Sequence, residues 1–311
     1  MAVFSEVGSP DLVGELSKLV RSPGTEIAFQ AYLPYYASRA WLSVPMFESF
    51  GKMVDAYGIV EGSEVIVKVE NALTVRIRPW KGVLFEKAKI KVIINGDDYG
   101  EVELPAEGLE FKLGAIRADR PIKSASLCGP AWKVYCDPFI IVRGDTTTEG
   151  KSQRFREWWE KFAKGAARNA KAADVTAEMA ENNNLVIFGT PSSNEYLAKI
   201  AGRLPFKYEG DNIVLPNGKK YDLTNHGLIL VYPNPEAPNR LVMVISGLEW
   251  GGKLPDNHLL DLVPDYVVFT ATSNPDDMTN NFAAAGFFDT YWQFDEKLME
   301  TGGMPPANQN K

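Results

Sequence analysis

The sequence of 311 residues is poor in the side chains that most often carry chemistry, with two cysteines and two histidines. A structural zinc site takes four Cys or His ligands, so these residues do not readily supply one, and we expect neither a metal nor a cofactor. Cys128 and Cys136 flank a Gly-Pro pair. One interpretation is two separate thiols, and the other is a disulfide across that turn in an oxidising compartment.

Long apolar runs and a strong positive charge are also missing. No run approaches the roughly 20 apolar residues that span a bilayer, so we expect no membrane partner. The net charge is -7, which argues against nucleic acid as a partner, because binding it needs clustered Lys and Arg. Residues 1–6 lack the basic and apolar segments of a signal peptide. This predicts either a cytoplasmic protein or a piece of a longer secreted one.

The signatures of common enzymes are absent as well. The chain contains no Gly-x-Ser-x-Gly elbow of a serine hydrolase, no His-Glu-x-x-His of a metalloprotease and no P-loop. The turn that follows Phe188 has one glycine where a dinucleotide fingerprint needs three. The sequence therefore leaves the question of enzymatic activity open and favours a non-catalytic protein.

What the first part of the chain does have is alternation of apolar and polar residues. This alternation is typical of half-buried strands, and in residues 64–70 one predicted face is apolar and the other charged. We expect an antiparallel β-sandwich over residues 24–145, after a helix and linker over residues 1–23. Residues 95–98 predict a turn between two strands. The predicted strands are residues 26–32, 39–47, 64–70, 73–78, 87–94 and 100–104.

The second part of the chain alternates helical patterns with buried-strand patterns. A polar break at residues 146–150 marks the expected boundary, and beyond it we predict a small three-layer α/β, Rossmann-like domain over residues 150–300. The tail over residues 301–311 is predicted to be disordered. The fold class is thus α+β or α/β. The predicted helices are residues 152–168, a shorter helix capped by Asp174, and a brief helix near His258. The predicted strands are residues 185–188, 227–232, 241–245 and 266–270, with a hairpin at 206–222 and a loop at 233–240.

One stretch organises this second part. A buried strand ends at Gly189, and a helical pattern follows Asn194. We expect Thr190 to cap that helix and Pro191 to take its first position. Free backbone N–H groups and the positive end of the helix would then face a ligand at the carboxyl edge of a sheet.

His226, at the start of a predicted buried strand, is the candidate general base or ligand contact near this turn. The alternative is a hydrogen-bonded residue at a strand entry. Ser192 and Ser193 with His226 form the candidate catalytic pair of a serine-type ester or amide hydrolase, although the glycines of a nucleophile elbow are missing. The predicted ligand site consists of Gly189, Thr190, Ser192, Ser193, Asn194, His226, Ser246 and Trp250.

Tryptophans near predicted strand ends are a further lead. Their faces would stack on an oligosaccharide or a peptide, or they would serve as buried anchors. These residues are Trp41, Trp80, Trp132, Trp250 and Trp292.

Several segments together carry a resemblance: residues 184–194, 197–205, 224–227, 232–235 and 246–247, with 26–32, 40–42 and 284–289 in support. They resemble a C-terminal region of large bacterial prolyl-oligopeptidase-like α/β-hydrolases of the planctomycete type. The catalytic residues of those enzymes lie upstream of this region. The resemblance therefore implies an accessory module, secreted or periplasmic, that binds substrate, shapes access or docks on an α/β-hydrolase domain. Thr190 stands where an acidic residue is expected, which weakens an anion or metal role for the turn.

Overall fold

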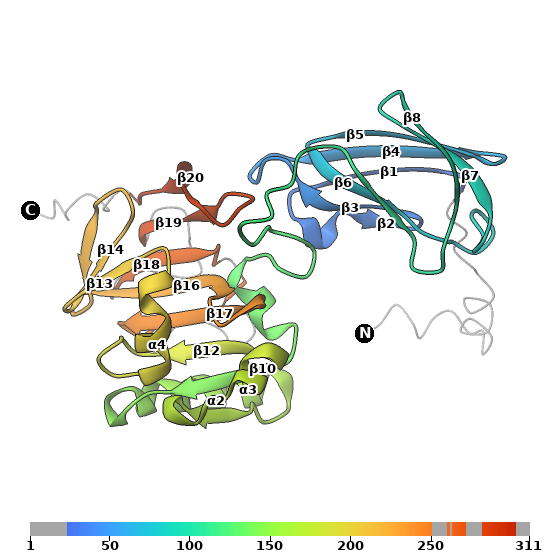
Figure 1. Cartoon of the computed structure of the whole chain (residues 1–311). Coiled ribbons are helices and arrows are strands. Elements are labelled where there is room, and N and C mark those ends of the chain that lie inside the picture. Colours follow the sequence, from blue (N-terminus) through green and yellow to red (C-terminus); the bar gives the residue numbers. More distant parts are fainter. Residues whose placement is uncertain (1–23, 251–259, 262, 272–281, 303–311) are drawn as a thin grey trace, which may run out of the picture.

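The computed structural model of the chain describes residues 24–250, 260–261, 263–271 and 282–302. These residues form two lobes, one strand-rich and one in which helices accompany a large sheet (Figure 1). The protein is thus a mixed α and β structure with several sheets. The helix predicted within residues 1–23, the brief helix near His258 and the tail after residue 302 fall outside the described residues.

The first lobe consists of two sheets with the orders β1-β4-β5-β7-β8 and β2-β3-β6-β9. Their apolar faces share one core, which runs from Ile27 to Phe111 in the sequence. The strands are β1 (Glu26–Ala31), β2 (Ser38–Arg39), β3 (Leu42–Phe47), β4 (Val54–Glu61), β5 (Glu64–Glu70), β6 (Ala72–Ile77), β7 (Lys89–Ile94), β8 (Asp97–Glu103) and β9 (Leu109–Lys112), with a 3-10 turn, η1 (Pro34–Tyr36).

The alternation in the sequence correctly predicts most of these strands. In β5 the three valines are buried in the core, Lys68 and Glu70 are exposed, and Glu64 and Ile66 are half-buried. Two strands were missed, β4 and β9. The expectation of a purely antiparallel arrangement is wrong at one place, because β5 and β7 pair in parallel. The sequence pattern shows which residues face the core, but it does not show the direction of the neighbouring strand.

The second lobe is built on an eight-stranded sheet with the order β11-β10-β12-β17-β16-β18-β19-β20. The first four strands are parallel and the others antiparallel. A three-stranded sheet lies beside it. The strands are β10 (Phe139–Arg143), β11 (Asn169–Lys171), β12 (Asn184–Phe188), β13 (Lys207–Glu209), β14 (Asn212–Val214), β15 (Lys220–Asp222), β16 (His226–Asn234), β17 (Ala237–Gly247), β18 (Tyr266–Thr270), β19 (Phe282–Phe288) and β20 (Phe294–Glu300).

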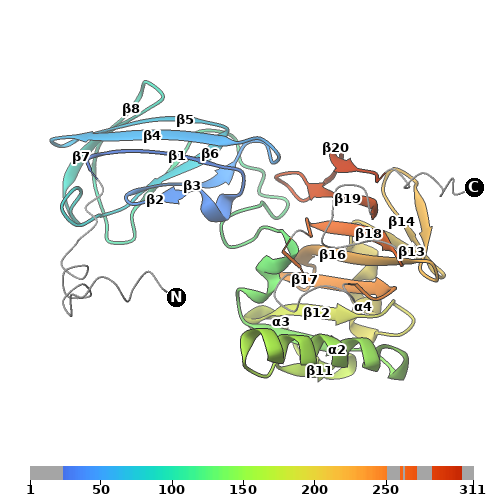
Figure 2. The ribbon, with the colours of Figure 1, turned by 180° about the vertical axis from the view of Figure 1, so that it is seen from behind.

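Three α-helices accompany the sheet within the described ranges: α2 (Thr146–Ala163), α3 (Ala177–Asn182) and α4 (Glu195–Ile200). Helix α4 is in front in Figure 1 and α2 in the opposite view of Figure 2, so they lie against opposite faces. Four 3-10 turns complete the lobes, of which η2 (Ala131–Tyr135), η3 (Ala172–Asp174) and η4 (Ala201–Arg203) belong here.

Both predicted helix starts in this region are wrong. Helix α2 begins at Thr146, where Asp145 accepts a hydrogen bond from the Thr147 amide at 2.9 Å. The polar residues 146–150, which we predicted to be a boundary between domains, therefore form the first turn of this helix. It contains threonines, which are weak helix formers, so it lacked a helical pattern. Helix α3 is capped by Thr176, whose Oγ1 accepts from Met179 N at 3.2 Å, and not by Asp174.

The hairpin expected over residues 206–222 is present as β13–β14–β15. The segment expected to be a loop at residues 233–240 is mostly strand, because β16 and β17 pair up to Asn234 and Ala237. Strands β11, β19 and β20 were not expected. Among the described helices, none combines the length and the apolar composition that crossing a membrane requires.

The two cores divide the chain between Phe111 and Leu127. Strand β10, which the predicted boundary left with the first domain, is an internal strand of the second lobe's sheet. The domain limits otherwise stay a prediction. The lobes touch through Phe50 and Phe287, whose ring centroids are 5.4 Å apart, and Thr290 Oγ1 donates to Glu48 O at 3.4 Å.

Candidate functional site

The predicted site residues gather at one edge of the eight-stranded sheet. Strands β12 and β17 are parallel and end together, and Gly189 N donates to Ile245 O at 3.0 Å. Strand β16 runs the other way, so its first residue, His226, lies at the same edge, where its carbonyl accepts from Leu248 N at 3.1 Å. We call this the carboxyl edge, after the ends of β12 and β17.

The turn after β12 uses its polar groups within itself. Thr190 N donates to Ser193 Oγ at 2.9 Å, and Ser193 N donates back to Thr190 O at 3.0 Å. The hydroxyls of Thr190 and Ser192 lie 2.8 Å apart. The backbone donors that we expected to be free for a ligand are thus largely engaged in the protein.

The helix cap was predicted at the wrong residue. Helix α4 begins at Glu195, and the Oδ1 of Asn194 accepts from Leu197 N at 3.0 Å, whereas Thr190 and Pro191 precede the helix. The buried Asn194 amide also donates to Phe188 O at 3.0 Å. It therefore ties the turn to the end of β12. With its six residues, α4 offers only a small dipole to a ligand.

Gly189 is required by this turn for two reasons. Its backbone φ is +118°, which residues other than glycine rarely adopt. A Cβ atom at this position would also lie 2.5 Å from Ser193 Oγ. The glycine that attracted attention in the sequence thus serves the tight closure of the turn.

Ser246 lies at the end of β17 and bridges two elements. Its Oγ donates to Gly189 O at 2.5 Å and lies 2.8 Å from the hydroxyl of Tyr208 in β13. Burial raises the pKa of Tyr208 well above its usual range, so this phenol stays protonated. Tyr208 was not among the predicted residues, because its hairpin lies beyond any local motif.

His226 is held by the segment just before it. Its Nδ1 lies 3.0 Å from Asp222 O, and because a carbonyl only accepts, Nδ1 carries the hydrogen in this contact. The Asp222 carboxylate is 3.9 Å away. Hydrogen bonds from Asn225 and from backbone N–H groups lower the pKa of Asp222, so it is charged. This contact leaves Nε2 of His226 unused.

The serines and His226 are not in contact. Strand β17 separates β12 from β16, which places them roughly 10 Å apart at the usual strand spacing. No hydrogen bond joins Ser192 or Ser193 to His226 in the described part of the chain. The arrangement does not bring a nucleophile to a base.

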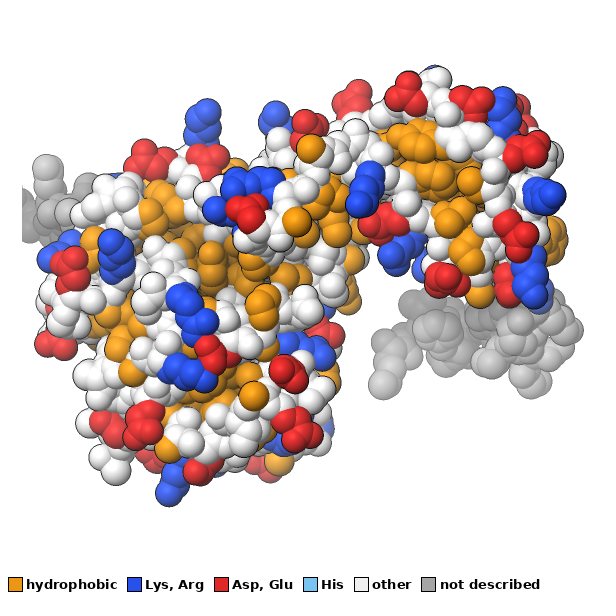
Figure 3. All heavy atoms as spheres, viewed as in Figure 1, with side chains coloured by type: hydrophobic (Ala, Val, Ile, Leu, Met, Phe, Trp, Pro, Cys, Tyr) orange, Lys and Arg blue, Asp and Glu red, His pale blue; other side chains and the backbone are white. Residues whose placement is uncertain are grey.

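Trp250 and most other tryptophans are structural anchors. Trp250 is buried and packs edge-to-face on Phe269, with centroids 4.8 Å apart. Trp41 and Trp292 are buried as well, and Trp80 and Trp132 are half-buried. Among the described residues, the large exposed apolar side chains are instead Tyr32, Tyr35, Tyr36, Phe85 and Phe162. On the face shown in Figure 3, charged side chains of both signs are interspersed, as expected for a surface without strong charge of one sign.

Helix α2 contributes cations to the carboxyl edge. Lys151 Nζ donates to Gly247 O, and Arg154 pairs with Glu249. Burial lowers the pKa of Lys151. Gly150-Lys151-Ser152 matches the end of a P-loop but follows Gly144 at the wrong spacing and lies inside the helix. Asp145 at the helix start adds a negative charge where a phosphate would bind, so the segment does not form a phosphate cradle.

A second polar centre lies between the lobes and is sealed. Lys123 Nζ is 2.5 Å from Asp265 Oδ2 and donates to Phe288 O at 2.7 Å. The ammonium sits 3.4 Å from the ring centroid of Phe50. The side chains of Lys123 and Asp265 are 1% and 0% exposed. Burial lowers the pKa of Lys123 and raises the pKa of Asp265, whereas the attraction between the two groups acts on both pKa values in the opposite direction. No local sequence pattern indicates this pair, because its members are 142 positions apart.

Both cysteines are free thiols. Cys128 is buried near the Lys123–Asp265 pair, and burial raises its pKa to about 11. Cys136 is exposed, and because both thiols are free, the structure has two separate thiols and not the disulfide of the other interpretation. Across the described ranges, no group of three or more His, Cys, Asp or Glu side chains is placed to hold a metal ion.

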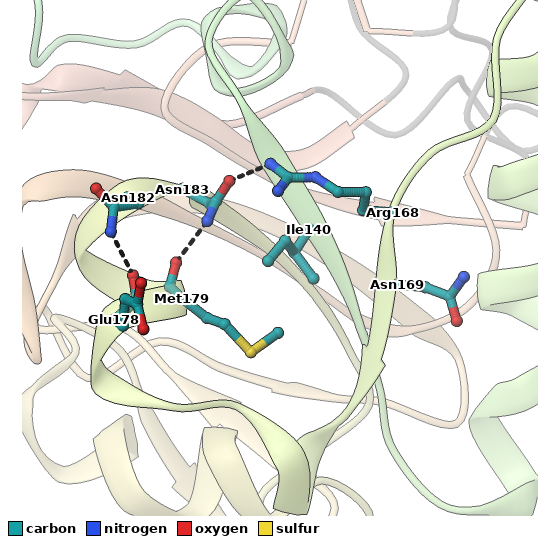
Figure 4. Close-up of a pocket in the computed structure, with 7 residues that line it drawn as sticks. All are labelled: Ile140, Arg168, Asn169, Glu178, Met179, Asn182 and Asn183. Carbon is teal, nitrogen blue, oxygen red and sulfur yellow. Dashed lines mark hydrogen bonds between the residues drawn. The ribbon is translucent and has the colours of Figure 1, made fainter.

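A cavity of about 630 Å³ opens at the opposite, amino-terminal edge of the parallel strands. Figure 4 shows the Arg168 guanidinium turned toward Asn183, beside Ile140 and Met179. Another cavity, of about 550 Å³, lies between the lobes near Met46 and Leu127. The first is lined by Ile140, Arg168, Asn169, Glu178, Met179, Asn182 and Asn183.

Comparison of the chain with protein-family models, with curated proteins and with solved structures finds no match.

Proposed function

We propose that this protein is a non-catalytic accessory module of the kind that the sequence resemblance implies, a C-terminal region of prolyl-oligopeptidase-like hydrolases. Its first lobe is then a β-sandwich and its second a three-layer, Rossmann-like domain. The module binds a peptide or an oligosaccharide, or docks on a hydrolase domain, and the carboxyl edge is its predicted contact surface.

One observation carries the non-catalytic part of this proposal. Among the described residues of the carboxyl edge, each serine hydroxyl has a partner other than a base. Ser193 Oγ accepts from Thr190 N, Ser192 Oγ lies beside Thr190 Oγ1, and Ser246 Oγ donates to Gly189 O. A serine nucleophile needs a base within hydrogen-bond reach, and His226 is two strands away from the turn.

Binding at this edge rests on a smaller set of groups. Ser192 is exposed, Thr190 is half-buried, and His226 Nε2 is not used by the Asp222 contact. A ligand with hydroxyl or amide groups would bond to these, as sugars and peptides do. Trp250 contributes to this edge by packing on Phe269, not by stacking on the ligand.

A fluorophosphonate probe tests the catalytic alternative. We expect no labelling of the intact chain. Covalent labelling that disappears in Ser192→Ala or Ser193→Ala would overturn the proposal and identify a serine hydrolase that reaches its active geometry with substrate.

A thermal-shift screen against peptides and oligosaccharides tests binding at the edge. We expect a stabilising ligand whose effect is lost in His226→Gln and kept in Asp55→Asn. Asp55 is a suitable control because it lies on β4 in the first lobe, in an exposed contact with Gln30. Stabilisation that His226→Gln leaves unchanged would remove the carboxyl edge as the contact surface.

A further inference from the structure

The cavity shown in Figure 4 belongs to a different part of the molecule from the predicted site. Ile140 lies in β10, and Asn183 immediately precedes β12, so the cavity opens where these parallel strands begin. Its volume of about 630 Å³ falls within the roughly 300–1,000 Å³ of small-molecule sites. It is therefore large enough to take a ligand of the size of an amino acid or dipeptide.

Arg168 is fixed at both ends in this cavity. Its backbone carbonyl accepts from Ile141 N at 2.9 Å, and its Nη2 donates to Asn183 Oδ1. Asn183 is 5% exposed and is itself oriented, because its Nδ2 donates to Met179 O at 2.8 Å. A buried amide thus holds the guanidinium in place before any ligand arrives, which lowers the entropy lost on binding.

The charge of Arg168 is not matched by the protein. A guanidinium has five N–H donors, and Asn183 accepts from one nitrogen only. No carboxylate among the described residues forms an ion pair with Arg168, unlike Arg143, Arg154 and Arg203, which each pair with a glutamate. The remaining donors of the fork suit a planar carboxylate, which Arg binds in a bidentate manner.

The other lining residues restrict the ligand further. Ile140 is buried and Met179 half-buried, so they offer apolar surface beside the guanidinium. Glu178 adds a negative charge to the lining, which opposes a second anionic group on the ligand and therefore disfavours a phosphate. It is compatible with a neutral amide or a protonated amine next to the carboxylate.

We propose that this cavity binds the α-carboxylate of a peptide C-terminus or of a free amino acid with an apolar side chain, with Arg168 as the carboxylate contact. This rests on the proposed function as a binding module and adds a second surface to it.

Isothermal titration of the full chain with three probes tests the proposal: N-acetyl-leucine, N-acetyl-leucinamide and free leucine. We expect saturable binding of a free acid and at least tenfold weaker binding of the amide, which lacks the charge. Preference for N-acetyl-leucine identifies a peptide C-terminus as the source, and preference for leucine identifies a free amino acid. Absence of saturable binding to both acids, or equal binding of acid and amide, would overturn the proposal.

Variants locate the site. We expect Arg168→Met to weaken binding of the acid at least tenfold, and Arg168→Lys, which keeps the charge without the fork, to weaken it less. Arg240→Met is the matched control, because Arg240 is half-buried, donates to Glu181 O at 2.8 Å and does not line the cavity. Circular dichroism establishes that each variant is folded, and Arg168→Lys serves if Arg168→Met is not. Binding that survives both Arg168 variants but is lost in His226→Gln would overturn the cavity site and leave the accessory-module proposal standing.

Discussion

Lys123 and Arg168 make the same kind of contact in two different surroundings. Each cation donates to one side-chain oxygen, of Asp265 and of Asn183 respectively. Lys123 is sealed between the lobes against the ring of Phe50, whereas Arg168 is exposed in an open cavity. The surroundings decide what such a contact does. A buried pair cannot be broken without leaving a charge in an apolar place, but an open cation is free to exchange water for a ligand.

Removing the sealed cation should have the largest effect. We expect Lys123→Met to lower the free energy of unfolding by about 3–5 kcal/mol, because Asp265 is left buried without its cationic partner and keeps only the hydrogen bond from Phe288 N. Urea unfolding measures the change. The double variant Lys123→Met with Asp265→Leu should recover part of the loss. A loss below about 1 kcal/mol for the single variant would show that water reaches this centre.

The thiol beside this pair should make stability depend on pH. Burial raises the pKa of Cys128 from 9.0 to about 11. Between about pH 9 and 11 the folded chain therefore keeps the thiol proton that the unfolded chain loses. The contribution of Cys128 to the free energy of unfolding is complete below pH 9 and is lost as the pH rises toward 11. The loss is on the order of 2 kcal/mol. Urea unfolding of Cys128→Ala between pH 8 and 11 should show a flatter decline than the wild-type chain, and parallel declines would contradict the prediction.

The carboxyl edge is closed by hydrogen bonds within the protein, and it should respond to the loss of one of them. We expect Asn194→Ala to lower the free energy of unfolding by about 1–2 kcal/mol, since both the cap to Leu197 N and the bond to Phe188 O are lost. Asn169→Ala, at an exposed position, is the control. An equal effect of the two variants on the denaturant midpoint would refute the structural role of Asn194.

The open cation should have the smallest effect on stability. Arg168→Met should change the free energy of unfolding by less than about 0.5 kcal/mol, because Arg168 is exposed and the Asn183 oxygen that loses its donor lines an open cavity that water can enter. A shift in the thermal midpoint as large as that of Lys123→Met would erase the distinction between the sealed and the open centre.

Local patterns in the sequence predicted the elements that carry them. Strand β5 alternates, β12 is continuously apolar and β18 is short and apolar, and all three lie where they were expected. Strand β19 was missed because its run of alanines around Gly286 has neither pattern.

The site could be predicted only in part, because its contacts are not local. The sequence pointed to Gly189 and to His226, and both lie at one edge of the sheet. The sequence pattern predicted Thr190 as the cap, but Asn194 takes this role by accepting from Leu197 N. Both residue types cap helices well, and the additional contact of Asn194 with Phe188 O is not visible in the sequence. Nothing near Lys123 or Arg168 in the sequence indicates their partners.

The division of the two cores before Leu127 bears on how the protein can be dissected. A fragment beginning at the polar stretch 146–150 would lack β10, and β12 would become an unpaired edge exposing Leu185 to Ile187 to association with other chains. A fragment that begins upstream of Lys123 keeps both the strand and the ammonium that Asp265 requires. A fragment for expression of the second lobe should therefore begin between residues 113 and 122.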